Sequence, residues 1–517
     1  MTAQEQDVIG YGWLARYFNI RVVQPFHVVS CIGRTRHTHE HESGRQETYL
    51  EAMRPADTPT AHLAFAMKHE GLHLEFLARL FGVMSEQELT AWVHREPTGQ
   101  YARRAGFFYE WLTRRELDIA EVGGNYRDAL DARYYVTRSH PVRNRRWRIN
   151  DNLPGTPEYC PLVRKTEIVE AFRHFDISAE LDTMEGEFGA DILLRSAVWL
   201  TIKESRASFV IEHEGQRRDR IQRFAQAMEH YCGNLDDSLD SHALSELQRA
   251  ILGLSTIQPG LRQSPVFVGS NSLQHGSVVH YVCPHWQWLA GMLDGLRHFL
   301  AATEKESSLI RAAVASFGFV FLHPLADGNG RVSRFLVNDV LRRDGQIPEP
   351  FILPVSATIT STAIRRAEYD RILECYSKPL MQVFTEAVSF SEKRHRYADG
   401  IASDFQFSAY DQAAPTWRYP DLTRQVEYLQ EVVQHTLEYE MHEQAAFQRA
   451  WYRTRLAIKD WLEGPDEHID RIIRSVRQSG GISGKLIKEF PVIQDEELAE
   501  RLVQEVENGF HDLKGNI

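Results

Sequence analysis

The residues with the clearest chemical potential lie in one short segment, His-Pro-Leu-Ala-Asp-Gly-Asn-Gly-Arg-Val-Ser-Arg, at positions 323–334. His323 is a candidate general base, and Asp327 is a candidate oxygen ligand for magnesium. Arg331 and Arg334, one helical turn apart, can reach different phosphates. Two glycines allow a tight loop whose backbone amides converge beside a helix N-terminus, which favours anions. The segment therefore predicts a phosphoryl-transfer site.

Helices must hold this segment. Apolar residues recur every three or four positions over residues 309–321, Pro324 ends that helix, and Arg331 begins the next. The same spacing predicts further helices at residues 63–81, 107–117, 188–211, 217–230, 243–254, 286–302, 421–440 and 443–462. Runs rich in Val, Phe and Tyr at residues 264–268 and 277–282 predict a β-hairpin, and residues 144–163 read as a connecting loop. The expected fold is all-α with one hairpin.

The 323–334 segment is similar to the signature of the Fic-domain family, His-x-Phe-x-(Asp/Glu)-Gly-Asn-Gly-Arg-x-x-Arg. It departs at Leu325, where the family has a buried phenylalanine, so we expect local repacking rather than lost chemistry. The resemblance implies AMPylation: a Ser, Thr or Tyr hydroxyl of a target protein attacks the α-phosphate of ATP, and pyrophosphate leaves. It makes His323 the base and Asp327 the Mg²⁺ ligand. It also implies an anion hole formed by Gly328, Asn329 and Gly330. By the same resemblance, Arg331 and Arg334 hold the outer phosphates.

A second pattern, from Ser208 to Glu212, is similar to the family's inhibitory motif (Ser/Thr)-x-x-x-Glu-(Gly/Asn). The two residues are four apart, on one face of a predicted helix. In the family, the glutamate pairs with the last arginine of the signature, here Arg334, and keeps the γ-phosphate from its productive position. The chain departs from the motif at His213. The resemblance implies a self-inhibited enzyme of the class whose inhibitory helix precedes the Fic core.

Two other regions also resemble the family. Residues 259–282, with the predicted hairpin, occupy the place of the flap, a strand pair that aligns an extended target by strand addition. Tyr369 lies in a helix that, by resemblance, helps enclose the nucleotide, although a helical tyrosine among apolar neighbours is also typical of a core position.

We expect three domains: a helical N-terminal domain at residues 1–165, a Fic domain at 166–390 and a helical C-terminal domain at 391–517. Two short helical patterns around residues 480–481, with basic residues nearby, resemble a helix-turn-helix, but acidic residues follow at 495–507. Two alternatives to the adenylyltransferase stay open: a de-AMPylating hydrolase at the same site, and a DNA-bound regulator using the C-terminal module. A homodimer also stays open.

Two histidine-rich stretches have patterns that could bind a metal ion. Residues 69–73 satisfy the His-Glu-x-x-His pattern of zinc proteases, but the predicted helix continues as a packing stripe, which favours structural histidines. Residues 37–41, His-Thr-His-Glu-His, read as a solvated loop with adventitious metal binding as the alternative.

The overall composition limits the class of protein. Hydrophobic residues make up 43% and charged residues 25% of the 517 residues, as in ordinary globular proteins. Five scattered cysteines predict reduced thiols, and a net charge of -12 disfavours nonspecific nucleic-acid binding. The absence of a secretory pattern at the start and of long apolar runs predicts a cytoplasmic protein without membrane spans.

Overall fold

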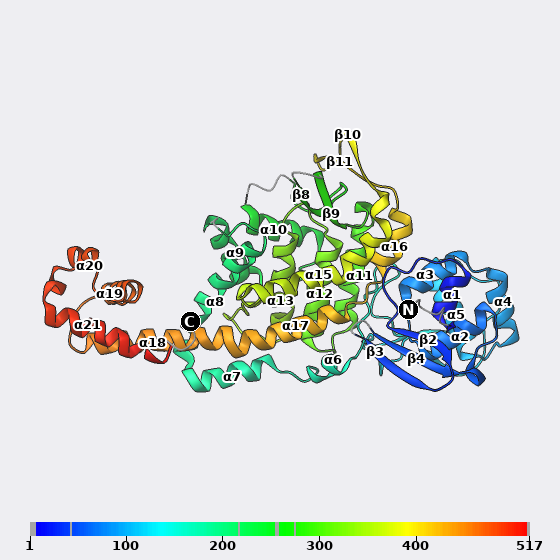
Figure 1. Ribbon diagram of the computed structural model, residues 1–517, viewed down its shortest axis with the longest axis horizontal. Helices are drawn as coiled ribbons and strands as arrows, with labels where there is room; N and C mark the ends of the chain where they lie inside the picture. Colours follow the sequence, from blue (N-terminus) through cyan, green and yellow to red (C-terminus); the bar gives the residue numbers. More distant parts are fainter. Residues whose placement is uncertain (1–6, 42–43, 216–217, 254–257, 273–275, 514–517) are drawn as a thin grey trace. The chain divides into compact units, whose positions relative to one another are not determined.

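The computed structural model describes residues 7–41, 44–215, 218–253, 258–272 and 276–513, and these residues are mostly helical, as predicted (Figure 1). They form two compact units, each built from separated stretches of chain. Unit 1 contains Met1–Phe175, Gly233–Leu341 and Arg366–Gln430, whereas unit 2 contains Asp176–Cys232, Arg342–Arg365 and Glu431–Ile517. Within the residues described, no helix is both long and apolar enough to cross a membrane.

The N-terminal part of unit 1 combines helices with two small sheets. Its helices are α1 (Tyr11–Tyr17), α2 (Pro59–His69), α3 (Leu74–Val83), α4 (Glu86–Arg95) and α5 (Gln100–Thr113). The first sheet has the order β1-β2-β4-β3, formed by Val8–Ile9, Val28–Gly33, Gly44–Leu50 and His37–His41. The second has the order β5-β7-β6, formed by Arg127–Asp128, Ile149–Asp151 and Val142–Asn144. The mostly helical fold therefore also contains sheets that the sequence pattern did not indicate.

Two local predictions for this part were wrong. Residues 37–41, expected as a loop, form the exposed edge strand β3, because their backbone pairs in an antiparallel ladder with β4. The predicted loop at residues 144–163 includes β7, which pairs with β6. In both cases pairing with a neighbouring strand supplied the hydrogen bonds, a contribution that local composition does not reveal.

The predicted helix at residues 63–81 is interrupted in the middle of the His-Glu-x-x-His pattern. Helix α2 ends at His69, Gly71 has a φ of 84°, and α3 begins at Leu74. His73 caps α3, because its Nδ1 accepts a hydrogen bond from the Phe76 backbone N–H at 3.2 Å. The two histidines therefore do not share a helical face. Among the described residues, no cluster of three metal-ligating side chains forms here or elsewhere.

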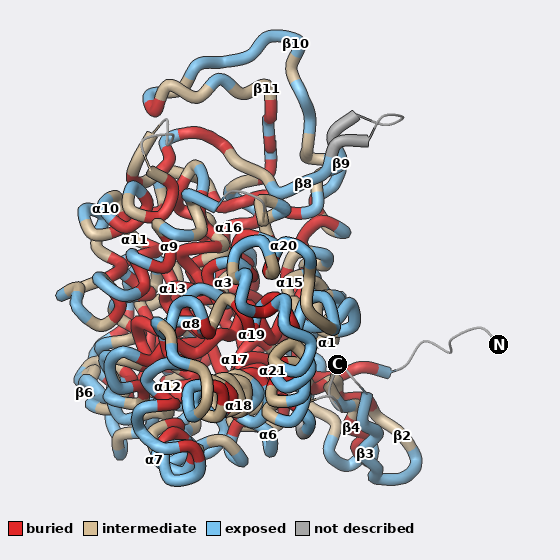
Figure 2. The backbone as a smooth tube through the Cα atoms, turned by 90° about the vertical axis from the view of Figure 1, so that its left-hand side faces the viewer, coloured by how far each residue is buried: buried red, intermediate tan, exposed pale blue. Residues whose placement is uncertain are grey.

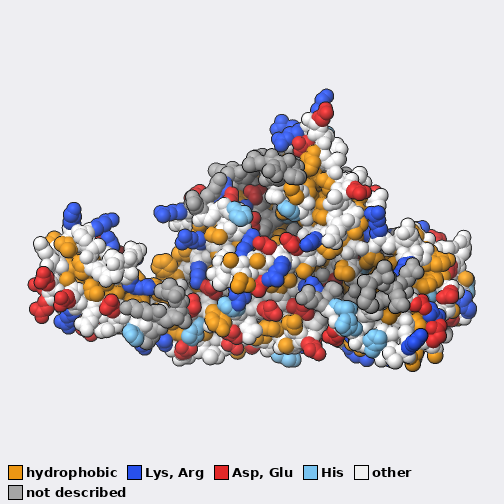
Figure 3. Space-filling view, viewed as in Figure 1, with side chains coloured by type: hydrophobic (Ala, Val, Ile, Leu, Met, Phe, Trp, Pro, Cys, Tyr) orange, Lys and Arg blue, Asp and Glu red, His pale blue; other side chains and the backbone are white. Residues whose placement is uncertain are grey.

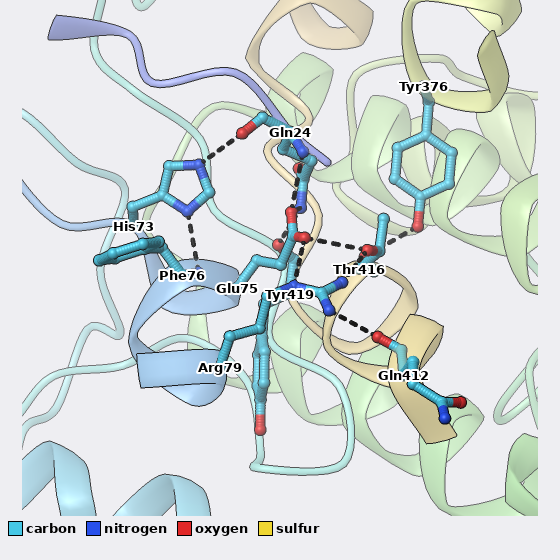
Figure 4. Close-up of polar contacts among 9 residues, drawn as sticks. All are labelled: Gln24, His73, Glu75, Phe76, Arg79, Tyr376, Gln412, Thr416 and Tyr419. Atoms are coloured by element: carbon cyan, nitrogen blue, oxygen red, sulfur yellow. Dashed lines mark hydrogen bonds and ion pairs between the residues drawn. The ribbon is translucent and has the colours of Figure 1, made fainter. Parts of the chain in front are cut away.

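A buried network ties this N-terminal part to α16 (Tyr410–Arg418), far along the chain (Figure 4). Glu75 of α3 accepts hydrogen bonds from the Gln24 backbone N–H at 3.0 Å and from the Thr416 hydroxyl at 3.0 Å. It also pairs with Arg79 at 2.9 Å, and its side chain is 1% exposed. The Thr416 backbone carbonyl accepts a hydrogen bond from the Tyr376 hydroxyl at 2.9 Å.

The remaining elements of unit 1 surround the 323–334 segment. The helices before this segment are α6 (Glu167–Ala171), α10 (Ser241–Leu252), α11 (Leu289–Ala302) and α12 (Ser308–Leu322). After it come α13 (Asn329–Arg343), α15 (Ala363–Phe384) and α17 (Thr423–His435). Two hairpins complete this part, β8–β9 (Phe267–Ser272 and Gly276–Val282) and β10–β11 (Val388–Arg396 and Ala402–Phe407). The first was predicted and is confirmed, whereas the second was missed within a strongly charged stretch.

Unit 2 consists of helices alone among its described residues. These are α7 (Ile177–Phe188), α8 (Ala190–Ile211), α9 (Arg218–Tyr231), α14 (Val355–Thr360), α18 (His442–Lys459), α19 (Asp466–Ser479), α20 (Gly484–Glu489) and α21 (Glu496–Gly509). The last four share an apolar core of their own. The helix after the Gly480 turn, α20, is short, and the longer α21 begins with two glutamates. Acidic residues on α21 would repel nucleic-acid phosphates.

Candidate active site

His323 stands at the C-terminal end of α12 in a left-handed backbone conformation, with φ 49° and ψ 54°. Its backbone N–H donates to the Phe319 carbonyl at 2.9 Å, which closes the helix. Histidine is one of the few non-glycine residues that adopt this conformation readily. Its Nδ1 lies 3.3 Å from the Val320 carbonyl oxygen and is placed to donate a hydrogen bond to it. In that tautomer Nε2 is the basic nitrogen.

The loop after His323 is braced from within by the side chain of Asn329. The Leu325 backbone N–H donates to Asn329 Oδ1 at 2.9 Å, and Asn329 Nδ2 donates back to the Leu325 carbonyl at 2.8 Å. Leu325 is fully buried, as a packing residue at this position should be. Gly328 has a φ of 91°, and a Cβ there would come within 3.1 Å of the Leu252 side chain. The side chain of Asn329 thus shapes the loop, while its backbone begins α13.

The charged residues of the segment differ in burial. Arg331 and Arg334, in the first turns of α13, are each 3% exposed, whereas the Asp327 side chain is 63% exposed. Arg331 Nη2 lies 2.9 Å from Asp327 Oδ1. Two largely buried guanidinium groups beside a helix N-terminus favour an anion. Asp327 offers one accessible carboxylate, which is how magnesium is commonly held when phosphates supply its other ligands.

Gln248 of α10 holds the loop from outside, and sequence reasoning missed it. This buried side chain donates from Nε2 to the Asp327 carbonyl at 2.7 Å. Its Oε1 accepts a hydrogen bond from the Gly260 backbone N–H at 2.9 Å. Gln248 therefore joins the loop to the chain that leads into the β8–β9 hairpin. A lone glutamine in an amphipathic helix carries no sequence signal for such a role.

Arg262 is a second support of the site that was named only as part of the flap region. It is 2% exposed, and its guanidinium donates to three carbonyl oxygens, those of His323 at 2.8 Å, Ser264 at 2.9 Å and Pro284 at 2.6 Å. Its backbone N–H donates to the Pro324 carbonyl at 2.9 Å. Burial lowers the pKa of Arg262. One side chain thereby connects the backbone of the candidate base to both ends of the hairpin.

The β8–β9 hairpin lies next to the loop. Its ladder pairs Phe267 with Val282 and Val268 with Tyr281, followed by a bulge. The Tyr281 hydroxyl donates to the Phe321 carbonyl at 2.6 Å, so the hairpin contacts the last turn of α12. Val268 is 42% exposed. The predicted flap is thus a fixed neighbour of the candidate base and presents apolar side chains to solvent.

Tyr369 lies in a buried aromatic cluster of α12, α15 and α17. Its ring centroid is 6.5 Å from that of Phe317 and 6.2 Å from that of Tyr428. The Arg366 guanidinium carbon lies 5.6 Å from the same ring. These contacts are those of a packing residue beside α12, the alternative that the sequence had already raised for Tyr369.

Ser208 and Glu212 lie at the C-terminal end of α8, in unit 2. Ser208 is buried, and Glu212 is the residue that caps the helix after its last residue, Ile211. His213 follows with φ 59°; its N–H donates to the Val210 carbonyl at 3.0 Å, while that of Glu214 donates to the Phe209 carbonyl at 2.8 Å. This is a Schellman motif, in which glycine or asparagine is favoured at the left-handed position. The departure at His213 thus falls where histidine is tolerated.

Comparisons with known proteins include one family match that contains this site. Residues 238–341 match the model of the Fic/DOC family. The protein adenylyltransferase fic-1 of Caenorhabditis briggsae is 34% identical over 27% of this chain and 24% of its own length. The protein adenylyltransferase Fic of Drosophila grimshawi is 34% identical over 21% of each chain. The chain therefore spans about a quarter of the length of these curated relatives. A Fic family protein from Desulfovibrio desulfuricans, known as a crystal structure, is 20% identical and covers 65% of this chain and 89% of its own, with a TM-score of 0.37.

Proposed function

Residues 238–341 form a Fic/DOC domain, and on this premise we propose that the chain is a protein adenylyltransferase. It transfers AMP from ATP to a Ser, Thr or Tyr hydroxyl of a target protein. The observation that carries the proposal is the 323–334 loop, which brings a candidate base, two buried arginines and a helix N-terminus together. The names of the matched relatives, which are protein adenylyltransferases, support the same reaction.

The proposed step transfers AMP from ATP to the target hydroxyl. His323 Nε2 takes the proton of the target hydroxyl as the hydroxyl oxygen forms a bond to the α-phosphorus. The bond from that phosphorus to the bridging oxygen breaks, and pyrophosphate leaves with the electron pair. Arg331 and Arg334 bind the outer phosphates and stabilise the charge that develops on them. Backbone amides at residues 328–330 receive the anion at the start of α13.

Asp327 is the residue that would hold Mg²⁺. Its side chain is largely exposed beside the proposed phosphate site, and carboxylate oxygen is the ligand type that magnesium prefers. Magnesium supplies charge neutralisation for the phosphates when it is bound. Because Asp327 also pairs with Arg331, we propose that metal and nucleotide binding release this arginine toward phosphate.

The test uses ATP labelled at the α-phosphate and, in parallel, ATP labelled at the γ-phosphate. Addition of the purified chain to a cell extract with magnesium should increase protein label from the α-labelled nucleotide alone, relative to the same extract without the chain. An increase in label from the γ-position instead would mean phosphoryl transfer by the chain and would refute AMP transfer. A sample that has already been labelled is then incubated without ATP. Release of AMP from it would favour the hydrolase instead.

We also propose that Glu212 suppresses transfer by competing with the γ-phosphate for Arg334. The support is the family-like pattern from Ser208 to Glu212 together with the helix-end geometry, which accommodates His213. A guanidinium that is paired with an internal carboxylate is not available to phosphate, and about 1.4 kcal/mol in favour of the closed form reduces a rare competent form tenfold.

Glu212→Gly should therefore raise self-modification by about tenfold or more, and adding His323→Ala should abolish it. The measurement is incorporation of α-label at saturating ATP and magnesium. Glu214→Gly is the matched control, because Glu214 is two residues away and pairs with Arg220 at 3.1 Å. Equal rates for the parent and Glu212→Gly, with a demonstrated target present, would remove the inhibitory role.

A further inference from the structure

The β10–β11 hairpin packs against the flap in unit 1. Phe390 of β10 and Phe405 of β11 both contact Phe267 of β8, with ring centroids 5.6 Å and 4.7 Å from its ring. The two phenylalanines also face each other across the ladder of the second hairpin. One aromatic cluster therefore fastens the strand ends of this hairpin to the flap.

A second attachment lies at the turn of the same hairpin. Asp399 Oδ2 accepts hydrogen bonds from the Gln263 backbone N–H at 2.8 Å and from the Ser264 hydroxyl at 2.7 Å. Asp399 is buried, and its other oxygen accepts from the Ile401 N–H at 3.1 Å. The hairpin is thus fixed to the start of the flap at both of its ends.

Between these attachments β10 bulges away from its partner. The ladder pairs Phe390 with Phe405 and then His395 with Ser403. Residues 391–394 of β10 consequently stand opposite the single residue Asp404 of β11. We call residues 391–396 the arch. Figure 2 shows it as a mostly exposed segment of β10 at the top of the view, above β8 and β9.

The arch is basic. Lys393, Arg394 and Arg396 are exposed, and Glu392 is the acidic residue among them. Figure 3 shows Lys and Arg side chains gathered over this hairpin. No carboxylate of the described chain lies within ion-pair distance of Lys393 or Arg394. In a chain with a net charge of -12, this is a local positive surface beside the proposed target-binding strand pair.

We propose that the arch binds an acidic stretch of the target protein, so that the substrates are proteins with acidic residues near the modified hydroxyl. This inference rests on the proposed function. An extended target that adds to the flap would pass close to the arch, where opposite charges select partners and speed encounter. The arch has few basic side chains, and Glu392 lies among them, so it offers a small positive surface for a nucleic-acid backbone. The size of this surface favours an acidic peptide as the ligand.

The experiment uses synthetic peptides with one threonine acceptor flanked by aspartates, by asparagines or by lysines. Transfer is measured as kcat/KM in the Glu212→Gly background at low salt. The aspartate peptide should be preferred over the lysine peptide by on the order of tenfold, and added salt should reduce this preference. The double change Lys393→Glu with Arg394→Glu should reverse the preference. Arg95→Glu, an exposed charge reversal on α4, should leave it unchanged.

Binding is measured separately from transfer, by fluorescence anisotropy of the labelled aspartate peptide on the His323→Ala chain with its arch intact or reversed. If charge reversal abolishes peptide binding, the proposal that the arch binds acidic targets is supported. If no peptide is modified in that case, only the proposed AMP transfer fails. Equal transfer to all peptides, or a preference for the aspartate peptide that survives the reversal, contradicts the role of the arch but not AMP transfer. The arch is equally overturned if duplex DNA binds more tightly than the peptide and is lost by the same reversal.

Discussion

His323 combines a backbone role with a proposed chemical one. It closes α12 in a left-handed conformation, while its ring is held through Nδ1 near the Val320 carbonyl. A base positioned in this way contributes to proton removal and little to phosphate binding. The left-handed backbone conformation limits which residues can replace His323, because only some residue types tolerate it.

For this reason we expect His323→Ala and His323→Asn to behave alike in transfer. Both should lower it by on the order of 10² to 10⁴, while ATP binding stays within about threefold. Asparagine tolerates the left-handed conformation, so its variant should also keep the parent's thermal stability. The measurements are label transfer, nucleotide titration and thermal unfolding. Near-parent transfer by His323→Asn would remove the histidine from the role of base.

Glu70 gives the N-terminal part of the chain a titratable buried group. Its carboxylate accepts a hydrogen bond from the Tyr11 backbone N–H at 2.7 Å, and burial raises the pKa of Glu70 to about 7 from about 4.5. A carboxyl group whose pKa is raised by folding contributes stability that is fully present below 4.5. That contribution is lost as the pH rises through 7.

We therefore expect the parent to lose unfolding free energy relative to Glu70→Gln between pH 4.5 and pH 8. The difference should be on the order of 2 to 3 kcal/mol, because glutamine stays neutral and can still accept from Tyr11. Urea unfolding at several pH values measures it, with the exposed Glu96→Gln as control. A parent–variant difference that is constant over this range would contradict the raised pKa.

At the level of elements, the candidate site is a junction of α12, α13, α10 and the flap, with Arg262 at its centre. The guanidinium satisfies three backbone carbonyls that come from the loop and from both ends of the hairpin. Each of these carbonyls would otherwise be buried without this donor, which is costly. The flap and the candidate base are thus held in one arrangement by a residue without a direct part in the chemistry.

Arg262→Met should accordingly destabilise the protein by about 2 to 5 kcal/mol and reduce transfer more than ATP binding. Methionine preserves apolar volume but donates no hydrogen bond. Thermal unfolding and label transfer to a peptide are the measurements, with the exposed Arg371→Met as the matched control. If the arginine merely filled space, the methionine variant would retain stability and transfer.

At the level of the whole chain, the residues predicted as an N-terminal domain share a compact unit with the 323–334 loop. The Glu75 network supplies a polar connection between α3 and α16, and the Glu75 side chain is almost fully buried. Residues joined in this way are expected to unfold together rather than one after the other.

We expect Glu75→Ala to cost about 3 to 5 kcal/mol, because it leaves the Arg79 guanidinium without its buried partner. Label transfer and tryptophan fluorescence should be lost at the same urea concentration, which would itself be lower than in the parent. Replacing both residues, Glu75→Leu with Arg79→Leu, should recover part of the loss. Two separated transitions in the parent would show that the N-terminal part folds on its own.

The parts of the fold and of the site that could be predicted are those whose sequence signal lies within a few neighbouring residues. The helices around the 323–334 segment and the flap hairpin follow from periodicity and turn residues within a few positions, and the structure contains them. The break after His69 was missed, because apolar residues continue on both sides of Gly71 and hide the interruption. The β10–β11 hairpin was missed because its strands are charged and exposed.

The sequence by itself determined the candidate chemistry: a histidine, an acid, glycines and paired arginines within one segment that is predicted to lie between two helices. Tertiary structure decided which distant residues hold that loop. Gln248, Arg262 and Asp399 act through single hydrogen bonds to backbone groups far away in the chain. Such bonds leave no periodic trace in the sequence, since their partners are backbone atoms that every residue possesses.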